Sequence, residues 1–171
     1  MKSTFIVFGA ICLCAATASA QAVNDAQIAS IVVTANQVDI DAGKLAEAKG
    51  SNAEVKAFGK QMVTDHSGVN KQAVALVTKL KVTPEDNATS KSLKAGGVDN
   101  VRNLEKLSGG AFDKAYVDHE VVYHQAVLDA VDKTLIPSAQ NAELKALLVK
   151  VRPAFVAHLE HAKMIQSSLG K

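Results

Sequence analysis

Two pairs of side chains that can bind metals lie within the apolar stripes of predicted helices. In the segment 58–70 (FGKQMVTDHSGVN), Met62 and His66 are four residues apart and share one face of a helix. Glu120 and His124 repeat that spacing later in the chain. Burying a polar side chain without a partner costs free energy, so soluble helices rarely direct such groups toward their own core. We therefore expect these side chains to meet partners inside the fold.

Asp39 and His158 occupy similar positions on two other predicted helices. When helical turns are counted from the expected helix ends, every candidate comes within about one turn of the middle of the bundle. Imidazole, carboxylate and thioether groups together suit copper, iron or zinc better than magnesium or calcium. The sequence thus predicts a transition-metal site with six candidate ligands: His66, His124, His158, Asp39, Met62 and Glu120.

A structural interpretation of the same residues stays open. Buried histidines and carboxylates can pair with one another and hold helices in register without any metal. Di-iron four-helix proteins carry Glu-x-x-His on two helices, and this sequence has no Glu-x-x-His. His161 lies on the flank of the stripe that contains His158, and His119 is expected to point into solvent. The missing motif makes a ferritin-like redox enzyme the least favoured function. The sequence also has no serine-nucleophile or phosphate-loop signature.

The elements that must position these residues are four long segments with helical periodicity and no strand-like alternation. Asn24 or Asp25 can cap the first segment, and Gly50 can end it. Ser51 and Glu54 fit a capping box at the start of the second, so the first two helices should form an antiparallel hairpin. The four predicted helices cover about residues 24–49, 51–81, 108–132 and 141–167.

The connection between the second and third helices, residues 82–107, is long and polar. We expect no more there than a short helical turn near Val101 and Leu104. A helix of 24 residues is about 36 Å long, and about 11 extended residues span that distance. The connection can therefore cross the bundle and make these two helices parallel. The predicted fold is all-α, a ferritin-like four-helix bundle with a long crossover between helices two and three.

The first twenty residues fit a signal peptide. Lys2 supplies a positive charge, residues 5–16 are apolar, and residues 18–20 (ASA) are a cleavage signal of the A-x-A type. Residues 21–171 would then form a single domain. We expect this domain to be periplasmic or secreted.

Composition excludes several classes of function for the exported domain. Cys12 and Cys14, the two cysteines of the sequence, lie in the predicted signal peptide, so the domain has no disulfide and no thiolate site. The net charge falls from +2 to +1 with the loss of Lys2, which is too small for a protein that mainly binds nucleic acid. No later run of about 20 apolar residues could span a membrane.

The chain combines several specific motifs over about residues 31–165. They are residues 62–66 (MVTDH), residues 112–117 (FDKAYV), His124, Pro153 and residues 158–162 (HLEHA). This combination resembles domain of unknown function 4142, a family of exported bacterial proteins that are often labelled outer-membrane proteins. The resemblance implies a ferritin-like four-helix fold and export, and it implies no established reaction. Where the family typically has glutamate, this chain has Asp39, which is one methylene shorter.

Two functions from different classes therefore compete. The first is binding or buffering of copper, iron or zinc through the central cluster. The second is a non-catalytic structural or stress-related role in the cell envelope, carried out through contacts with a protein partner. Geometry can test the first function, because imidazoles of His66 and His124 more than about 10 Å apart could not share one ion, given bonds near 2 Å.

Overall fold

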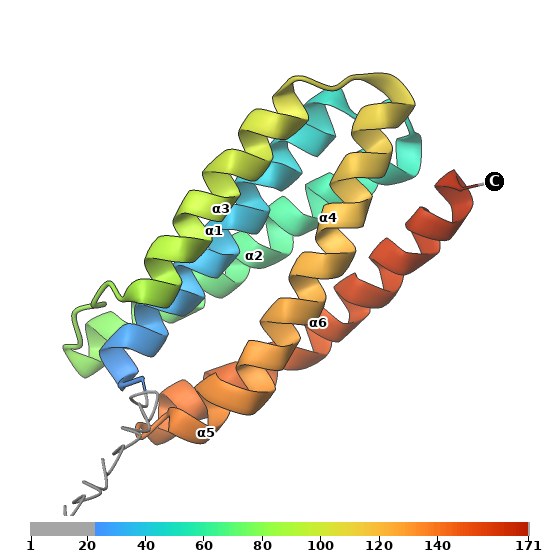
Figure 1. Cartoon of the computed structure of the whole chain (residues 1–171). Helices are drawn as coiled ribbons and strands as arrows, with labels where there is room; N and C mark the ends of the chain where they lie inside the picture. Colours follow the sequence, from blue (N-terminus) through green and yellow to red (C-terminus); the bar gives the residue numbers. More distant parts are fainter. Residues whose placement is uncertain (1–22, 171) are drawn as a thin grey trace, which may run out of the picture.

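The computed structural model describes residues 23–170, which fold into an all-α bundle without a strand (Figure 1). Its elements are α1 (Asp25–Lys49), α2 (Ala53–Leu80), α3 (Ala88–Glu105), α4 (Gly109–Ala130), η1 (Val131–Leu135), α5 (Ile136–Ser138) and α6 (Ala142–Leu169). The predicted fold class is confirmed, and the four predicted helices correspond to α1, α2, α4 and α6. Within these residues, no helix is long and apolar enough to cross a bilayer. The predicted signal peptide lies outside the described residues.

The crossover between α2 and α4 differs from the prediction. Instead of an irregular segment with one short turn, it contains α3, a helix of 18 residues. Asn87 begins this helix, because its side chain accepts hydrogen bonds from the backbone N–H groups of Thr89 and Ser90. α3 lies along α1 and carries the chain back to the other end of the bundle, so α2 and α4 run parallel (Figure 1). The parallel arrangement is the one that the length of the connection predicts.

Small residues explain why the periodicity of α3 is weak in the sequence. The buried positions of α3 are Ser90, Gly97 and Leu104, a narrow face with little apolar surface. A Cβ added at Gly97 would lie 2.6 Å from Cγ2 of Val38, so the glycine allows α3 to approach α1 closely. In the sequence, this glycine favours the prediction of a loop, because glycine has a low helix propensity. Tertiary packing against α1 outweighs that preference.

The turn between α1 and α2 is as short as predicted, but its caps differ. Asn24 caps α1 and Gly50 ends it. The expected capping box of Ser51 and Glu54 is wrong, because Asn52 is the N-cap of α2 and accepts a hydrogen bond from the backbone N–H of Glu54. Ser51 is therefore free to bond elsewhere, and its partner belongs to α4, as described below.

α1 and α2 pack with their backbones in near contact. A Cβ added at Gly59 would lie 2.7 Å from the carbonyl oxygen of Gly43, and a Cβ added at Gly43 would lie 2.7 Å from that of Gly59. Both positions accept only glycine without a backbone shift. This close crossing places Asp39 of α1 and His66 of α2 at neighbouring levels in the interior.

Apolar residues form separate clusters on the two sides of a polar middle. The cluster near the α1–α2 turn includes Phe58, Met62 and Tyr116. The cluster at the opposite end includes Ile28 and Leu148. The buried polar residues between these clusters are Asn36, Asp39, His66, Glu120, His124 and His158. The fold therefore keeps a polar group of side chains inside the bundle with apolar layers above and below.

Candidate metal centre

Three histidines from three helices converge in the middle of the bundle. His66 of α2, His124 of α4 and His158 of α6 are at most 2 % exposed. The ring centroid of His66 lies 5.6 Å from that of His124 and 5.2 Å from that of His158, and the last two are 5.5 Å apart. One nitrogen of each ring lies within 4.8 Å of the other two. The distance condition for a shared ion is therefore met.

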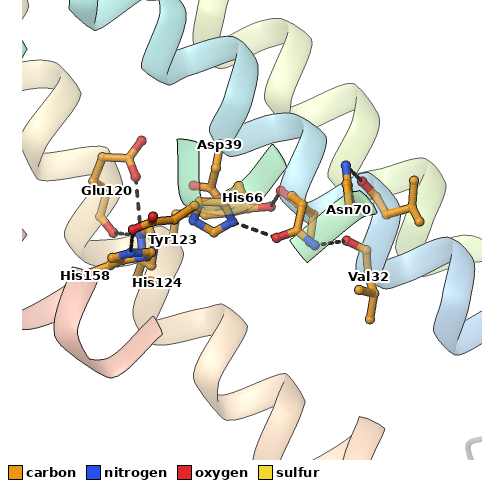
Figure 2. A network of polar contacts seen from close by, with 12 residues as sticks. Val32, Asp39, His66, Asn70, Glu120, Tyr123, His124 and His158 are labelled. Atoms are coloured by element: carbon orange, nitrogen blue, oxygen red, sulfur yellow. Dashed lines mark hydrogen bonds and ion pairs between the residues drawn. The ribbon is translucent and has the colours of Figure 1, made fainter. Parts of the chain in front are cut away.

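Each of these rings has one nitrogen that is held by an oxygen atom. Nδ1 of His66 donates to Oδ1 of Asn36 at 2.7 Å, and the same amide donates to the carbonyl oxygen of Val32 (Figure 2). Nδ1 of His124 donates to the carbonyl oxygen of Glu120 at 3.1 Å. Nε2 of His158 donates to Oδ2 of Asp65 at 2.9 Å. Such contacts fix the tautomer and the orientation of the ring, as they do for histidines that bind metals.

The remaining nitrogen of each ring is buried and has no hydrogen-bond partner among residues 23–170. These atoms are Nε2 of His66, Nε2 of His124 and Nδ1 of His158. The opposite nitrogen carries the proton in each neutral ring, so each of these three atoms presents a lone pair whenever its own ring is neutral. Buried polar atoms without partners are rare, because each one costs free energy. Three such atoms on three neighbouring rings indicate a position for a ligand.

Two carboxylates border the histidines. Oδ2 of Asp39 lies 3.5 Å from Nδ1 of His66, and Oε2 of Glu120 lies 3.3 Å from Nδ1 of His124. Asp39, Glu120 and His124 form a second group whose ligand atoms lie within 4.8 Å of one another. Figure 2 shows both carboxylates beside the imidazole cluster. Burial, followed by the negative charge of Glu120, raises the pKa of Asp39 well above its usual value.

The three imidazoles differ in their affinity for protons. Burial and the neighbouring charges of His124 and His158 lower the pKa of His66 to about 2. Burial also lowers the pKa of His158, although the hydrogen bond to Asp65 opposes this effect. For His124, burial is outweighed by the contacts with Glu120 and the charge of Asp39, which raise its pKa to about 9. At neutral pH the metal-free cluster therefore holds one imidazolium beside two neutral rings.

Met62 and His119 are the two remaining residues that the sequence analysis singles out. Met62 is fully buried one turn before His66, but it belongs to the apolar cluster near the α1–α2 turn and packs against Gly43. His119, predicted to point into solvent, has a side chain only 30 % exposed. Its ring stacks on Tyr123, which covers it, so a solvated His119 is a wrong prediction.

The supporting residues Asn36, Asp65 and Tyr123 were missed as members of the site. Asn36 precedes Asp39 by three residues on the same face of α1, and Asp65 precedes His66 directly. The hydroxyl of Tyr123 donates to the carbonyl oxygen of Ala35. A buried asparagine one turn from a buried aspartate is a signal that the sequence offers. The contact of Asp65 with His158 depends on the packing of α2 against α6, so no local pattern could reveal it.

Asp113, which the sequence explains by the helix dipole alone, has a different role. Its carboxylate accepts hydrogen bonds from the backbone N–H and the hydroxyl of Ser51 and from the backbone N–H of Asn52. It therefore ties the first turn of α4 to the α1–α2 turn. With three donors satisfied, Asp113 is a structural residue and stands apart from the candidate metal centre.

The comparisons with known proteins place the chain in a family. No curated protein and no solved structure matches it. Domain of unknown function DUF4142 matches residues 12–165, which is most of the chain and includes every candidate ligand. Over these residues the chain belongs to the DUF4142 family, as its motifs predict.

Proposed function

We propose that this chain binds one transition-metal ion, zinc or copper, through His66, His124 and His158, with iron as the third candidate. Two observations support the proposal: one nitrogen of each of the three buried rings lies within 4.8 Å of the other two, and each ring has one nitrogen without a hydrogen-bond partner among the described residues. Neutral imidazole is a preferred ligand of these metals. Metal–nitrogen bonds of about 2.0–2.1 Å require nitrogens within about 4 Å of one another, so shifts of about 1 Å would close the site.

The surroundings also favour a cation. Carboxyl oxygens of Asp39 and Glu120 lie 3.5 and 3.3 Å from ring nitrogens of two of the ligands, and their negative charge would offset the charge of the ion. Three protein ligands leave the fourth position of a tetrahedral ion open, which is typical of sites that bind a further small molecule. A purely structural cluster would leave one nitrogen of each of the three rings buried without a hydrogen-bond partner among the described residues, and no benefit from helix register explains that arrangement.

Calorimetric titration of Zn²⁺ and Cu²⁺ tests the proposal. Wild type should bind one ion per chain, and His158→Gln should weaken binding at least about 100-fold, the upper range for loss of an outer-shell partner. Binding at neutral pH should release a proton, because ligands must be deprotonated and His124 holds one. Titration in buffers of different ionisation enthalpy measures that proton.

His161→Gln is the matched control for this titration. His161 lies on the same helix as His158, but its Nδ1 faces Oε1 of Gln61 at 3.2 Å and it belongs to neither ligand group. Its replacement should leave the affinity for both ions unchanged. If wild type binds neither ion stoichiometrically, or if both variants lose affinity equally, the central cluster is structural and the proposal fails.

We also propose that the protein is exported and that the signal peptide is removed after Ala20. The charge of Lys2, the apolar segment and the ASA sequence support this assignment. N-terminal sequencing of protein from the periplasmic fraction should then begin at Gln21. An intact Met1 on that protein would contradict the assignment.

A further inference from the structure

An apolar cavity of about 270 Å³ leads to the candidate metal centre. It lies between α1, α4 and α6, and α3 covers one side of it. Its walls are almost entirely apolar and include Ile31, Val127, Leu148 and Phe155. The ring of Phe155 stacks flat against His66, with an interplanar angle of 5°. The cavity is therefore in direct contact with the imidazole cluster.

The cavity has a polar inner end and an exposed outer end. At the inner end, Asp39 and His66 line the wall, and Oδ1 of Asp39 and Nε2 of His66 have no hydrogen-bond partner among the described residues. At the outer end, the lining residues Thr89 of α3 and Ala126 of α4 are exposed. A small molecule that enters at the exposed end can thus lie against the side chains of Asp39 and His66.

The wall of the cavity also contains an irregular element. Val131 and Leu135 line it and belong to η1, a π-helical turn of five residues. Turns of this kind cost hydrogen-bond geometry and occur frequently at functional sites. Here two apolar side chains of the turn line the cavity. This observation supports a functional cavity independently of the imidazoles.

Charge selects the kind of molecule that fits. The cavity lining contains no lysine or arginine, and its polar end presents a carboxylate and an imidazole lone pair, both of which accept hydrogen bonds. An anionic head group would be buried there without a cationic partner, which costs free energy. A hydroxyl group can donate to either acceptor and carries no charge. The complementary head group is therefore an alcohol or a phenol.

Volume limits the body of that molecule. An engineered apolar cavity of about 150 Å³ stays dry and holds benzene. A cavity of about 270 Å³ has room for a longer body, comparable to an alkyl chain of about seven carbons, if its packing is similar. A water-filled state is unfavourable, since nearly the whole wall is apolar and water needs several polar partners.

We propose that this cavity binds a small neutral alcohol or phenol, with its apolar body between α1, α4 and α6 and its hydroxyl group beside Asp39 and His66. The inference extends the proposed function by giving the ligand of the open side of the metal centre. Binding of the apolar body does not require the ion, so the two proposals can fail separately.

Titration of 1-heptanol into metal-free and zinc-loaded protein, followed by calorimetry and methyl NMR, tests the inference. One molecule should bind, and contacts should appear between the alkyl chain and the methyl groups of Val127 and Leu135. Heptanoate, which has the same body and a negative head group, should bind metal-free protein at least about tenfold more weakly, or about 1.4 kcal/mol. Equal binding of both molecules, or no binding of heptanol, would overturn the proposal.

Two tryptophan variants locate the binding site. Ala126→Trp should block the mouth and weaken heptanol binding at least about tenfold, a loss of about 1.4 kcal/mol. Val122→Trp, at a position 70 % exposed on the same helix and outside the cavity, should leave binding unchanged. If Ala126→Trp folds poorly, the NMR contacts between heptanol and the methyl groups of wild type locate the site on their own. Contacts with methyl groups outside the cavity would then reject the proposed site. Zinc binding without heptanol binding rejects only this inference, and heptanol binding without zinc binding rejects only the metal centre.

Discussion

Helix α4 carries two buried carboxylates seven positions apart that have opposite surroundings. Asp113 is 1 % exposed and accepts three hydrogen bonds from the α1–α2 turn. Glu120 is fully buried, yet neither carboxylate oxygen has a hydrogen-bond partner among residues 23–170. Its nearest partner is the imidazole of His124. The two carboxylates are therefore equally buried, and they differ in the number of hydrogen-bond donors that surround them.

This difference separates a structural site from a candidate binding site. Folding itself satisfies Asp113, so nothing further is needed at the α1–α2 turn. Asp39 and Glu120 keep unsatisfied oxygens next to three unsatisfied ring nitrogens. Natural proteins retain such costly groups mainly where they serve a ligand, a proton or an ion. Substitutions in the region around Asp113 and in the central cluster can test this difference.

The largest effect is expected at Phe58, in the region near Asp113. Phe58 is fully buried and its ring packs against that of Tyr116 at 6.2 Å. Phe58→Ala should lower the free energy of unfolding by about 3–5 kcal/mol, with or without metal, because it creates a cavity in a well-packed cluster. Urea denaturation measures the loss.

Leu147→Ala is the comparison for Phe58→Ala. The sequence predicts that Leu147 faces the core, but the structure leaves it only partly buried at the edge of its cluster. Its replacement should cost less than about 2 kcal/mol, since little buried surface is lost. A cost for Phe58→Ala below about 0.5 kcal/mol, as for surface changes, would show that the apolar cluster near the α1–α2 turn is not tightly packed.

A matched pair of substitutions tests the two kinds of carboxylate directly. Asp113→Asn should cost about 2–4 kcal/mol, because an amide cannot accept all three hydrogen bonds and its N–H₂ group would face donors. Asp39→Asn should cost less than about 1 kcal/mol in metal-free protein. The raised pKa of Asp39 shows that burial favours the neutral form, which asparagine resembles.

Metal affinity should respond in the reverse order to these two substitutions. Asp39→Asn removes negative charge beside the ligands and should weaken zinc binding, whereas Asp113→Asn should not, provided that the protein stays folded. Calorimetry on both variants gives the answer. Equal costs in stability and equal zinc affinities would mean that the two carboxylates do not differ in function.

The last prediction concerns the dependence of stability on pH in metal-free protein. The pKa of His66 falls from about 6.5 in the unfolded chain to about 2 in the folded one. Below pH 6.5 the unfolded state binds a proton that the folded state does not. Stability should therefore fall by about 1.4 kcal/mol per pH unit as the pH decreases, and His158, whose pKa is also lowered, acts in the same direction.

His124 and Asp39 shape the rest of the pH profile. The raised pKa of His124, about 9, gives stability that is fully present below pH 6.5 and is lost as the pH rises through 9. The raised pKa of Asp39 also makes stability fall as pH rises, so it opposes the acid effect of His66. The measurement therefore compares wild type with His66→Gln between pH 5 and 6.5. Identical slopes would show that His66 is not buried as a neutral ring.

Much of the fold could be predicted from local patterns. The apolar period of 3.6 residues locates α1, α2, α4 and α6, and Asn24 and Gly50 fit the two ends of α1. The same period places His66, His124 and His158 on inward faces. α3 could not be found in this way, because Gly97 and Ser90 form a buried face that is small and polar. Its stability comes from packing against α1 rather than from periodicity.

By itself, the sequence determined that the candidate ligands lie inside the bundle, because residue spacing along a helix gives the direction of each side chain. Only the tertiary structure decided which atoms of those side chains are satisfied. Asn36 and Asp65 orient the rings of His66 and His158, and Asp113 finds its donors in Ser51 and Asn52. These contacts depend on the rotation and separation of neighbouring helices, which no single helix encodes. The free nitrogens, and the cavity that lies against His66, are products of that packing.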